Sequence, residues 1–198
     1  MRFVLASFNR DKLRELRDLL APVGVELVPL AEFPGAGPPP ETGATLEENA
    51  LLKARAAVIH TQLPAIADDT GLEVEALDGR PGINAARYAG PAATYADNVR
   101  KLLGELASVP PAGRAARFRT VCVACWPDGV EFAAHGVLEG RIAAAPRGRG
   151  GFGYDPVFEV DATGRTLAEL GEAEKNALSH RGQAARRLAE LIRIRLAA

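Results

Sequence analysis

Residues 114–143 place the strongest constraint on the fold. Their sequence, RAARFRTVCVACWPDGVEFAAHGVLEGRIA, contains two long strand-like segments on either side of a Pro-Asp-Gly turn. This pattern predicts a long β-hairpin. The rest of the chain alternates between strand-like and helix-like segments. The combination predicts an α/β or α+β fold with a mixed β-sheet.

The other elements are assigned from apolar spacing and from residues that begin or end helices. Leucines recur at helical spacing until Pro22 ends the first helix. Thr45 with Glu48, and Thr94 with Asp97, have the spacing of a capping box. The expected strands are 2–7, 25–30, 63–69 and 71–77; the expected helices lie within 9–24, 45–62, 95–107 and 180–196; residues 31–43 form a Pro/Gly-rich loop.

The size and charge of the chain exclude several classes of partner. Its 198 residues show no internal repeat or linker, so we expect one domain over residues 1–198, with two lobes and no separable linker. A net charge of −1 gives no global attraction to nucleic acid or to an anionic membrane. No apolar run approaches the roughly 20 residues that span a bilayer, and the N-terminal sequence is unlike a signal peptide.

Cys122 and Cys125 have a C-x-x-C spacing that could indicate a redox pair or a zinc site. They lie in a predicted strand, where residues three apart face opposite sides. No second Cys/His pair completes a zinc site. We therefore interpret both as buried structural thiols and expect a cytoplasmic protein.

Residues 7–12, SFNRDK, lie between the first predicted strand and helix. Backbone N–H groups and the helix dipole favour an anion at such a position. Ser7, Asn9 and Lys12 add side-chain donors and a positive charge. An ordinary capped turn is the alternative, and the sequence is not a Walker P-loop.

Acidic residues gather around the second helix and the third strand. Glu41 precedes the predicted second helix, and Asp68 and Asp69 are expected to lie at the end of the predicted third strand. Carboxylates of this kind suit Mg²⁺, which needs only one or two of them together with substrate phosphates. Glu47 and Glu48 are explained by the dipole of the helix that they begin. The aspartate pair requires a nearby cation, because adjacent like charges after an apolar strand are unfavourable.

Residues 148–155, GRGGFGYD, contain a G-x-G-x-x-G pattern. A dinucleotide-binding fingerprint must precede a helix, whereas a strand follows here, so that reading is excluded. The loop could instead stack on a base and hydrogen-bond it, or form a tight turn with a core aromatic residue. Near the last helix, a cationic set comprises Lys175, His180 and Arg181.

Five stretches occur in order across nearly the whole chain: VLASFNRDKLREL, ETGATLEENALLKARAA, IADDTGLEVEALDGRPGINAARYAG, GGFGYDPVF and EKNALSHRGQA. Their order and spacing resemble the non-canonical purine nucleoside triphosphate pyrophosphatase family. The resemblance implies an elongated α/β fold, in which helical lobes on a mixed sheet flank a central nucleotide-binding cleft, and a homodimer. It also implies Mg²⁺-dependent hydrolysis of ITP, dITP and XTP to the monophosphate and pyrophosphate, which cleanses the nucleotide pool of deaminated purines.

The resemblance also implies roles for individual residues. Glu41 and Asp69 would bind the metal, and Asp69 would also accept the proton of the attacking water. Phe8 stands where glycine is common in the phosphate-binding turn. The residues expected to contact substrate are Ser7, Phe8, Asn9, Arg10, Asp11, Lys12, Lys53, Thr70, Phe152, Gly153, Tyr154, Asp155, Lys175, His180 and Arg181.

Elementary chemistry adds two expectations. Lys12 and Lys53 would stabilise phosphate charge, and donors such as the Arg181 guanidinium would suit the 6-oxo group of the base. Neighbouring side chains on a strand face opposite sides, so Asp68 should anchor the strand end, or reach the metal through water, while Asp69 does the chemistry. Two other functions remain open: a Maf-like pyrophosphatase of modified or pyrimidine triphosphates, and a non-catalytic nucleotide-binding module.

Overall fold

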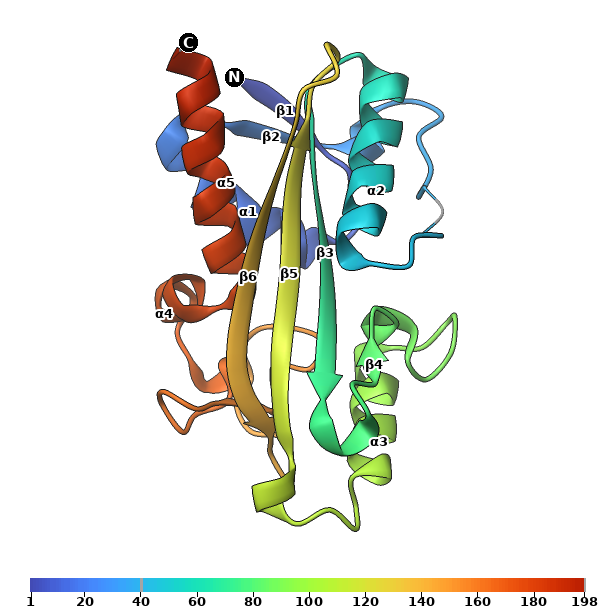
Figure 1. Ribbon diagram of the computed structural model, residues 1–198, viewed down its shortest axis with the longest axis vertical. Coiled ribbons are helices and arrows are strands. Elements are labelled where there is room, and N and C mark those ends of the chain that lie inside the picture. The colour runs from blue at the N-terminus through green and yellow to red at the C-terminus, as the bar shows by residue number, and fades with distance from the viewer. Residues whose placement is uncertain (40, 198) are drawn as a thin grey trace. The chain divides into compact units, whose positions relative to one another are not determined.

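The computed structural model describes residues 1–39 and 41–197, which form an α/β fold, as predicted (Figure 1). The strands are β1 (Arg2–Leu5), β2 (Glu26–Pro29), β3 (Ala65–Val74), β4 (Pro81–Gly82), β5 (Ala115–Cys125), β6 (Glu131–Ile142) and β7 (Phe158–Val160). The helices are α1 (Arg10–Leu20), α2 (Leu46–Thr61), α3 (Tyr95–Glu105), α4 (Glu172–Leu178) and α5 (His180–Ala197).

The strands form one mixed sheet in the order β2-β1-β3-β5-β6-β7, with β4 paired to β3. β1 runs parallel to β2 and β3, whereas β4 and β7 run antiparallel to β3 and β6. The predicted hairpin is β5 and β6, and the Trp126 N–H donates to the Val130 carbonyl at 2.9 Å to close its turn. The prediction of a mixed sheet is therefore confirmed.

The chain folds into two compact units. Unit 1 comprises Met1–Asp69, Thr120–Gly136 and the C-terminal segment from His180, and unit 2 comprises Thr70–Arg119 and Val137–Ser179. The chain passes from one unit to the other within β3, β5 and β6 and between α4 and α5. That the two make a single domain stays a prediction.

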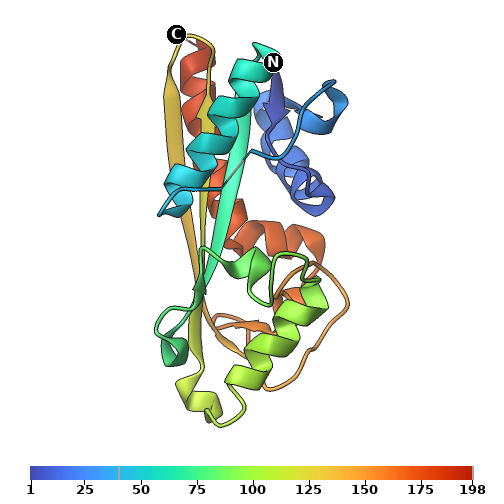
Figure 2. The same ribbon diagram turned by 90° about the vertical axis from the view of Figure 1, so that its right-hand side faces the viewer.

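In unit 1, helices cover both faces of the sheet (Figures 1 and 2). α1 and α5 pack on one face, where Leu16 is buried with Phe3. α2 packs on the other face, where the small side chain of Ala54 lies in a core with Val4. Because Phe3 and Val4 are neighbours on β1, their side chains point to opposite faces. One strand therefore serves two cores.

Cys122 and Cys125 follow the same alternation. Both are free and buried, Cys122 in the core under α1 and α5 and Cys125 in the core under α2. Burial raises the pKa of both thiols, that of Cys125 to about 12, so they stay protonated at neutral pH. The prediction of buried structural thiols is confirmed.

Unit 2 has its own core beneath α3 (Figure 2). Leu102 and Leu106 are fully buried in it, together with Leu72 on β3 and Phe158 on β7. Thr94 and Asp97 begin α3 with the predicted capping box, in which each side chain accepts from the backbone of the other. Across residues 1–39 and 41–197, no helix has both the length and the apolar character to cross a bilayer.

The structure corrects the predicted division of residues 63–77 into two strands. β3 runs without interruption over Ala65–Val74, and a 3-10 turn follows over Glu75–Leu77. The strand continues because its first half pairs with β1 and its second half with β4. Asp68 and Asp69 therefore lie inside a strand, and the prediction that they end it was wrong.

Two helix starts also differ from the prediction. A separate helix, α4, precedes α5, and Ser179 between them is extended, with φ −64° and ψ 154°. At α2, Thr45 accepts from the Glu48 N–H as predicted. The Glu48 carboxylate, however, accepts from the Ala44 N–H at 2.6 Å, one residue before the expected partner.

Candidate active site

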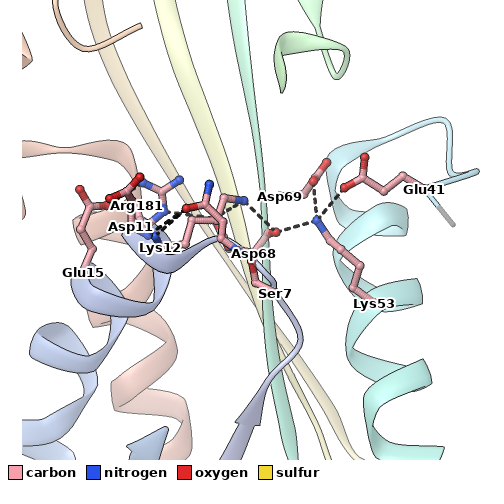
Figure 3. A network of polar contacts seen from close by, with 10 residues as sticks. Ser7, Asp11, Lys12, Glu15, Glu41, Lys53, Asp68, Asp69 and Arg181 are labelled. Carbon is pink, nitrogen blue, oxygen red and sulfur yellow. Dashed lines mark hydrogen bonds and ion pairs between the residues drawn. The ribbon is translucent and has the colours of Figure 1, made fainter. Parts of the chain in front are cut away.

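Asp68 and Asp69 are the centre of a buried polar network in unit 1 (Figure 3). The two residues are 2% and 7% exposed, and their side chains point to opposite faces of β3. The Asp68 carboxylate meets groups from α1 and α5, whereas the Asp69 carboxylate meets Lys53 from α2. The predicted asymmetry between the two aspartates agrees with this geometry.

Asp68 lies between two cations. Its Oδ2 is 3.0 Å from Lys12 Nζ and 3.1 Å from Arg181 Nε. Arg181 also donates to Glu15 Oε2 at 2.7 Å, and Glu15 is itself 4% exposed. These residues form a chain of alternating charges from α1 through β3 to the first turn of α5.

The charges in this chain determine the protonation of Asp68. Burial alone would raise the pKa of its carboxyl, but the positive charges of Lys12, Arg181 and Lys53 outweigh burial and hold that pKa below its ordinary value. Burial lowers the pKa of Lys12, against the opposing effect of Asp68. Asp68 is therefore a fixed anion that orders its cations and is poorly suited to exchange protons.

Asp69, Glu41 and Lys53 form the second cluster. Lys53 Nζ donates to Asp69 Oδ1 at 2.6 Å, to Glu41 Oε1 at 3.3 Å and to the Asp68 carbonyl at 2.8 Å. Burial raises the pKa of Asp69 despite the attraction of Lys53. For Lys53, burial is outweighed by Asp69, Asp68 and Glu41, and its pKa is raised. Two carboxylates thus converge on one ammonium.

The Glu41 and Asp69 pair suits a magnesium ion. Mg²⁺ usually takes one or two carboxylates and completes its shell with water and substrate phosphates. Zinc needs three or four protein ligands, and no group of three or more His, Cys, Asp or Glu side chains that could hold a metal occurs within residues 1–39 and 41–197. The donor set therefore fits a magnesium ion shared with substrate and does not fit zinc.

The predicted phosphate-binding turn precedes α1. Asn9 caps the helix, because its Oδ1 accepts from the N–H groups of Asp11 and Lys12 at 2.9 and 3.3 Å. Ser7 Oγ accepts from the Asn9 N–H at 3.2 Å. The Lys12 ammonium also lies 3.4 Å from the Asp68 carbonyl, while Phe8 is exposed. These hydrogen bonds define the start of α1, from which Lys12 reaches Asp68 on β3.

Unit 2 contains a separate part of the predicted set. Lys175 Nζ donates to Asp155 Oδ2 at 2.6 Å and lies 4.9 Å from the centre of the Phe152 ring. The same carboxylate oxygen accepts from the Phe152 N–H at 2.8 Å. A Cβ atom on Gly151 would lie 2.1 Å from this oxygen, so the loop tolerates only glycine there. The Tyr154 hydroxyl is buried and donates to the Ala85 carbonyl at 2.8 Å.

The cationic set near the C-terminus is divided by the break at Ser179. Lys175 lies on α4 in unit 2, whereas His180 and Arg181 begin α5 in unit 1. A Cβ atom on Gly136 of β6 would lie 1.9 Å from the His180 carbonyl, so glycine allows the first turn of α5 to lie against the strand. The three residues lie near the start of the last helix, as predicted, and the helix α4 that carries Lys175 was not predicted. Thr70 and Gly153 lie in unit 2, and Arg10 is the first residue of α1. The contacts of these three residues with substrate stay predictions.

Sequence reasoning missed two buried residues beside the site, Glu15 and Asn49. Glu15 lies on α1, one turn after Lys12, so helical spacing places both on one face. Asn49 lies on α2, one turn before Lys53, by the same spacing. In each case a signal was present, because each polar residue shares a helix face with a predicted site lysine.

Known proteins are similar to this chain in sequence and in fold. Residues 3–191 match the model of the Ham1 family. The dITP/XTP pyrophosphatase of Thioalkalivibrio sulfidiphilus is 51% identical over 192 residues, covering 96% of this chain and 97% of that protein. That of Thermus thermophilus is 50% identical over 190 residues, covering 96% and 91%.

Solved structures agree with these relatives. A HAM1 protein from Coxiella burnetii superposes with a TM-score of 0.87 at 44% identity, covering 97% of this chain and 98% of that one. The nucleoside-triphosphatase / dITP/XTP pyrophosphatase from Mycobacterium abscessus gives 0.75 at 46% identity, covering 96% and 98%. The resemblance found in the motifs is confirmed, and the chain belongs to the Ham1 family.

Proposed function

We propose that the protein hydrolyses non-canonical purine nucleoside triphosphates, such as dITP, ITP and XTP, to the monophosphate and pyrophosphate. Relatives at 51% and 50% identity are named dITP/XTP pyrophosphatases, and each match covers 96% of this chain. They confirm the prediction of an enzyme of the nucleoside triphosphate pyrophosphatase class. The observation that carries the mechanism is the convergence of Glu41, Asp69 and Lys53.

Asp69 is proposed as the general base. Burial raises the pKa of its carboxyl, which makes the carboxylate a better proton acceptor than an exposed aspartate. Asp69 takes a proton from a water whose oxygen bonds to the α-phosphorus. The bond from that phosphorus to the bridging oxygen breaks in line, and pyrophosphate leaves with the electron pair.

Cationic groups of unit 1 are proposed to bind the phosphates. The ammonium groups of Lys12 and Lys53 are held in fixed positions by buried carboxylates, so little reorganisation is needed when charge develops. A magnesium ion on Glu41 and Asp69 would supply further neutralisation of the triphosphate. Asp68 keeps Lys12 and Arg181 in place without taking part in proton transfer.

Base recognition is proposed for the cluster of Phe152, Asp155 and Lys175. Phe152 offers a ring for stacking, and the Lys175 ammonium is a donor suited to the 6-oxo group of a deaminated purine. Arg181, the donor expected from the sequence, is bound to Glu15 and Asp68, and Lys175 is bound to Asp155. Lys175 is the preferred donor because it also lies over the Phe152 ring, which is proposed to stack on the base.

A substrate panel tests the proposed function. Purified protein would be incubated with Mg²⁺ and dITP, ITP, XTP, GTP, dTTP or UTP, and released pyrophosphate would be separated from phosphate. We expect pyrophosphate from the first three and little from the others. Activity confined to dTTP or UTP would favour a Maf-like function, and tight ITP binding without pyrophosphate release would favour a binding module.

We also propose the homodimeric state implied by the resemblance and the cytoplasmic location expected from the sequence. Light scattering of the purified protein tests the first, because a dimer has twice the mass of the 20.9 kDa chain. Cell fractionation tests the second.

A further inference from the structure

The segment that carries Glu41 is fastened to the first turn of α2 by two hydrogen bonds. The Gly43 N–H donates to Asn49 Oδ1 at 2.8 Å, and the Ala44 N–H donates to Glu48 Oε2 at 2.6 Å. Asn49 is 1% exposed, whereas Glu48 is exposed. The bond from Gly43 to Asn49 is therefore the one sheltered from water, and it is the stronger constraint on the segment.

The orientation of the Asn49 amide is set by this bond. Its Nδ2 has no hydrogen-bond acceptor in the part of the chain that the structure describes, residues 1–39 and 41–197. Burying the Nδ2 donor without a partner destabilises the fold. Asn49 thus has its acceptor directed at Gly43 at the expense of its donor.

Gly43 is packed so closely on α2 that a side chain would not fit. A Cβ atom there would lie 2.7 Å from Glu48 Cβ and 2.9 Å from both the backbone nitrogen and Oδ1 of Asn49. Gly37 in the same Pro/Gly-rich loop is a contrast, because a Cβ atom there would meet nothing within 4 Å. Close contact is thus specific to the end of the loop that carries Glu41.

Asn49 and Lys53 are four residues apart on α2, so they lie on the same face one turn apart. Asn49 holds the backbone two residues after Glu41, and Lys53 binds the Glu41 carboxylate at 3.3 Å. We propose that Asn49 is a positioning residue for metal binding, which fixes Glu41 beside Asp69 by clamping Gly43. This inference rests on the proposed function of Glu41 and Asp69 as ligands of a divalent cation.

The physical consequence concerns the affinity for the cation. If the segment is released, Glu41 occupies its binding position for only a fraction of the time, and the apparent dissociation constant rises by the inverse of that fraction. The loss of one buried hydrogen bond corresponds to about a fivefold to tenfold change. Because the clamp acts on the ligand alone, turnover at saturating cation should be nearly unchanged.

The test compares Asn49→Ala and Gly43→Ala with the control Gly37→Ala. Mg²⁺ binding would be titrated by calorimetry without substrate, and pyrophosphate release from ITP would be measured against Mg²⁺ concentration. For both Asn49→Ala and Gly43→Ala, we expect the dissociation constant for Mg²⁺ to rise about fivefold to tenfold. Turnover should return to near the wild-type rate at excess Mg²⁺, and Gly37→Ala should match the wild type throughout.

Three outcomes would overturn the inference. The first is an unchanged dissociation constant in both variants, even if their melting temperatures fall, because that result indicates a purely structural role. The second is a loss of turnover that excess Mg²⁺ does not restore. The third is an equal effect of Gly37→Ala. If Asn49→Ala does not fold, Gly43→Ala decides alone, and if the wild type binds no Mg²⁺ and releases no pyrophosphate, the proposed function itself has failed.

Discussion

The ammonium of Lys53 lies 2.6 Å from Oδ1 of Asp69 in the interior of unit 1. The same nitrogen is 3.3 Å from Oε1 of Glu41, so Lys53 binds both carboxylates that are proposed to hold the metal. A lysine ammonium and a divalent cation cannot occupy the same carboxylate oxygens. Lys53 therefore competes with a divalent cation for the negative charge of these two carboxylates.

Replacing Lys53 with methionine should raise the affinity for Mg²⁺ in the absence of substrate while lowering turnover. The variant removes a competing charge from the two carboxylates, so we expect the dissociation constant to fall by about tenfold or more. It also removes an ammonium that stabilises phosphate charge, so pyrophosphate release should fall at least about tenfold. Calorimetric titration with Mg²⁺ at pH 8 and initial rates with ITP would measure the two effects.

Lys12→Met is the matched control for this prediction. It removes the same charge near the site, but Lys12 contacts Asp68, whereas Lys53 is the lysine that contacts Glu41 and Asp69 (Figure 3). Its effect on Mg²⁺ affinity should therefore be clearly smaller. Equal gains in both variants would indicate a general charge effect, and the idea of direct competition would be abandoned.

Asp68→Asn and Asp69→Asn should separate stability from catalysis. Asp69→Asn removes the proposed general base and should lower turnover at least about a hundredfold. Burial disfavours the charged form of Asp69 and Lys53 keeps Glu41 as a partner, so a neutral amide at position 69 should lower the free energy of unfolding less than one at position 68. Asp68→Asn removes the buried counter-charge of Lys12 and leaves Arg181 with Glu15 alone, so it should lower that free energy by about 3 kcal/mol and reduce turnover less.

Urea unfolding and single-substrate kinetics on the same preparations would measure both quantities. Wild-type turnover in Asp69→Asn would show that another group accepts the proton. A larger catalytic loss in folded Asp68→Asn than in Asp69→Asn would reverse the roles assigned to the two aspartates.

The opposite orientations of the Asp68 and Asp69 side chains could be predicted from the sequence, because side chains alternate along a strand. The position of the pair within the strand could not. Nothing local marks Thr70 as a continuation. β3 continues past it because β1 pairs with the first half of the strand, β4 with the second half, and β5 lies beside it in the sheet. Local patterns indicate where a strand is favourable, whereas its length depends on which neighbours are available.

The same distinction applies to helices and ion pairs. The capping box of Thr94 and Asp97 is local and was predicted correctly. The break at Ser179 carries no glycine or proline within the turn, so its extended backbone was not predicted. The partnership of Glu15 with Arg181 joins residues 166 positions apart, and only the packing of α1 against α5 brings them together.

The buried Asp68 carboxylate should make the protein less stable in acid. Its pKa is held below the ordinary value of 3.8, so its contribution to stability is fully present above about pH 4 and is lost as the pH falls toward its pKa in the folded state. The pKa of Asp69 is raised, so its effect on stability has the opposite sign. Burial of the charged Asp69 carboxylate lowers stability at pH values above its pKa in the folded state, and this penalty disappears in acid. Comparison with Asp68→Asn isolates the first effect.

The measurement is urea unfolding of the wild type and of Asp68→Asn at several pH values between 7 and about 3. The difference in unfolding free energy between them should be largest near neutral pH and should shrink below about pH 4. A difference that stays constant across this range would mean that Asp68 is not the titrating group.

Lys175→Met should weaken recognition of the base, and Lys101→Met should not. Both lysines lie over an aromatic ring, Lys175 at 4.9 Å from the centre of Phe152 and Lys101 at 4.4 Å from that of Tyr88. Lys175 is buried and paired with Asp155, whereas Lys101 is exposed on α3.

If Lys175 donates to the 6-oxo group, its loss should reduce kcat/KM for ITP at least about tenfold, mainly through KM, while Mg²⁺ affinity without substrate stays unchanged. Circular dichroism would show that the variant is folded, and a matching loss in Lys101→Met, or an unchanged KM in folded Lys175→Met, would refute the assignment of Lys175 to the base.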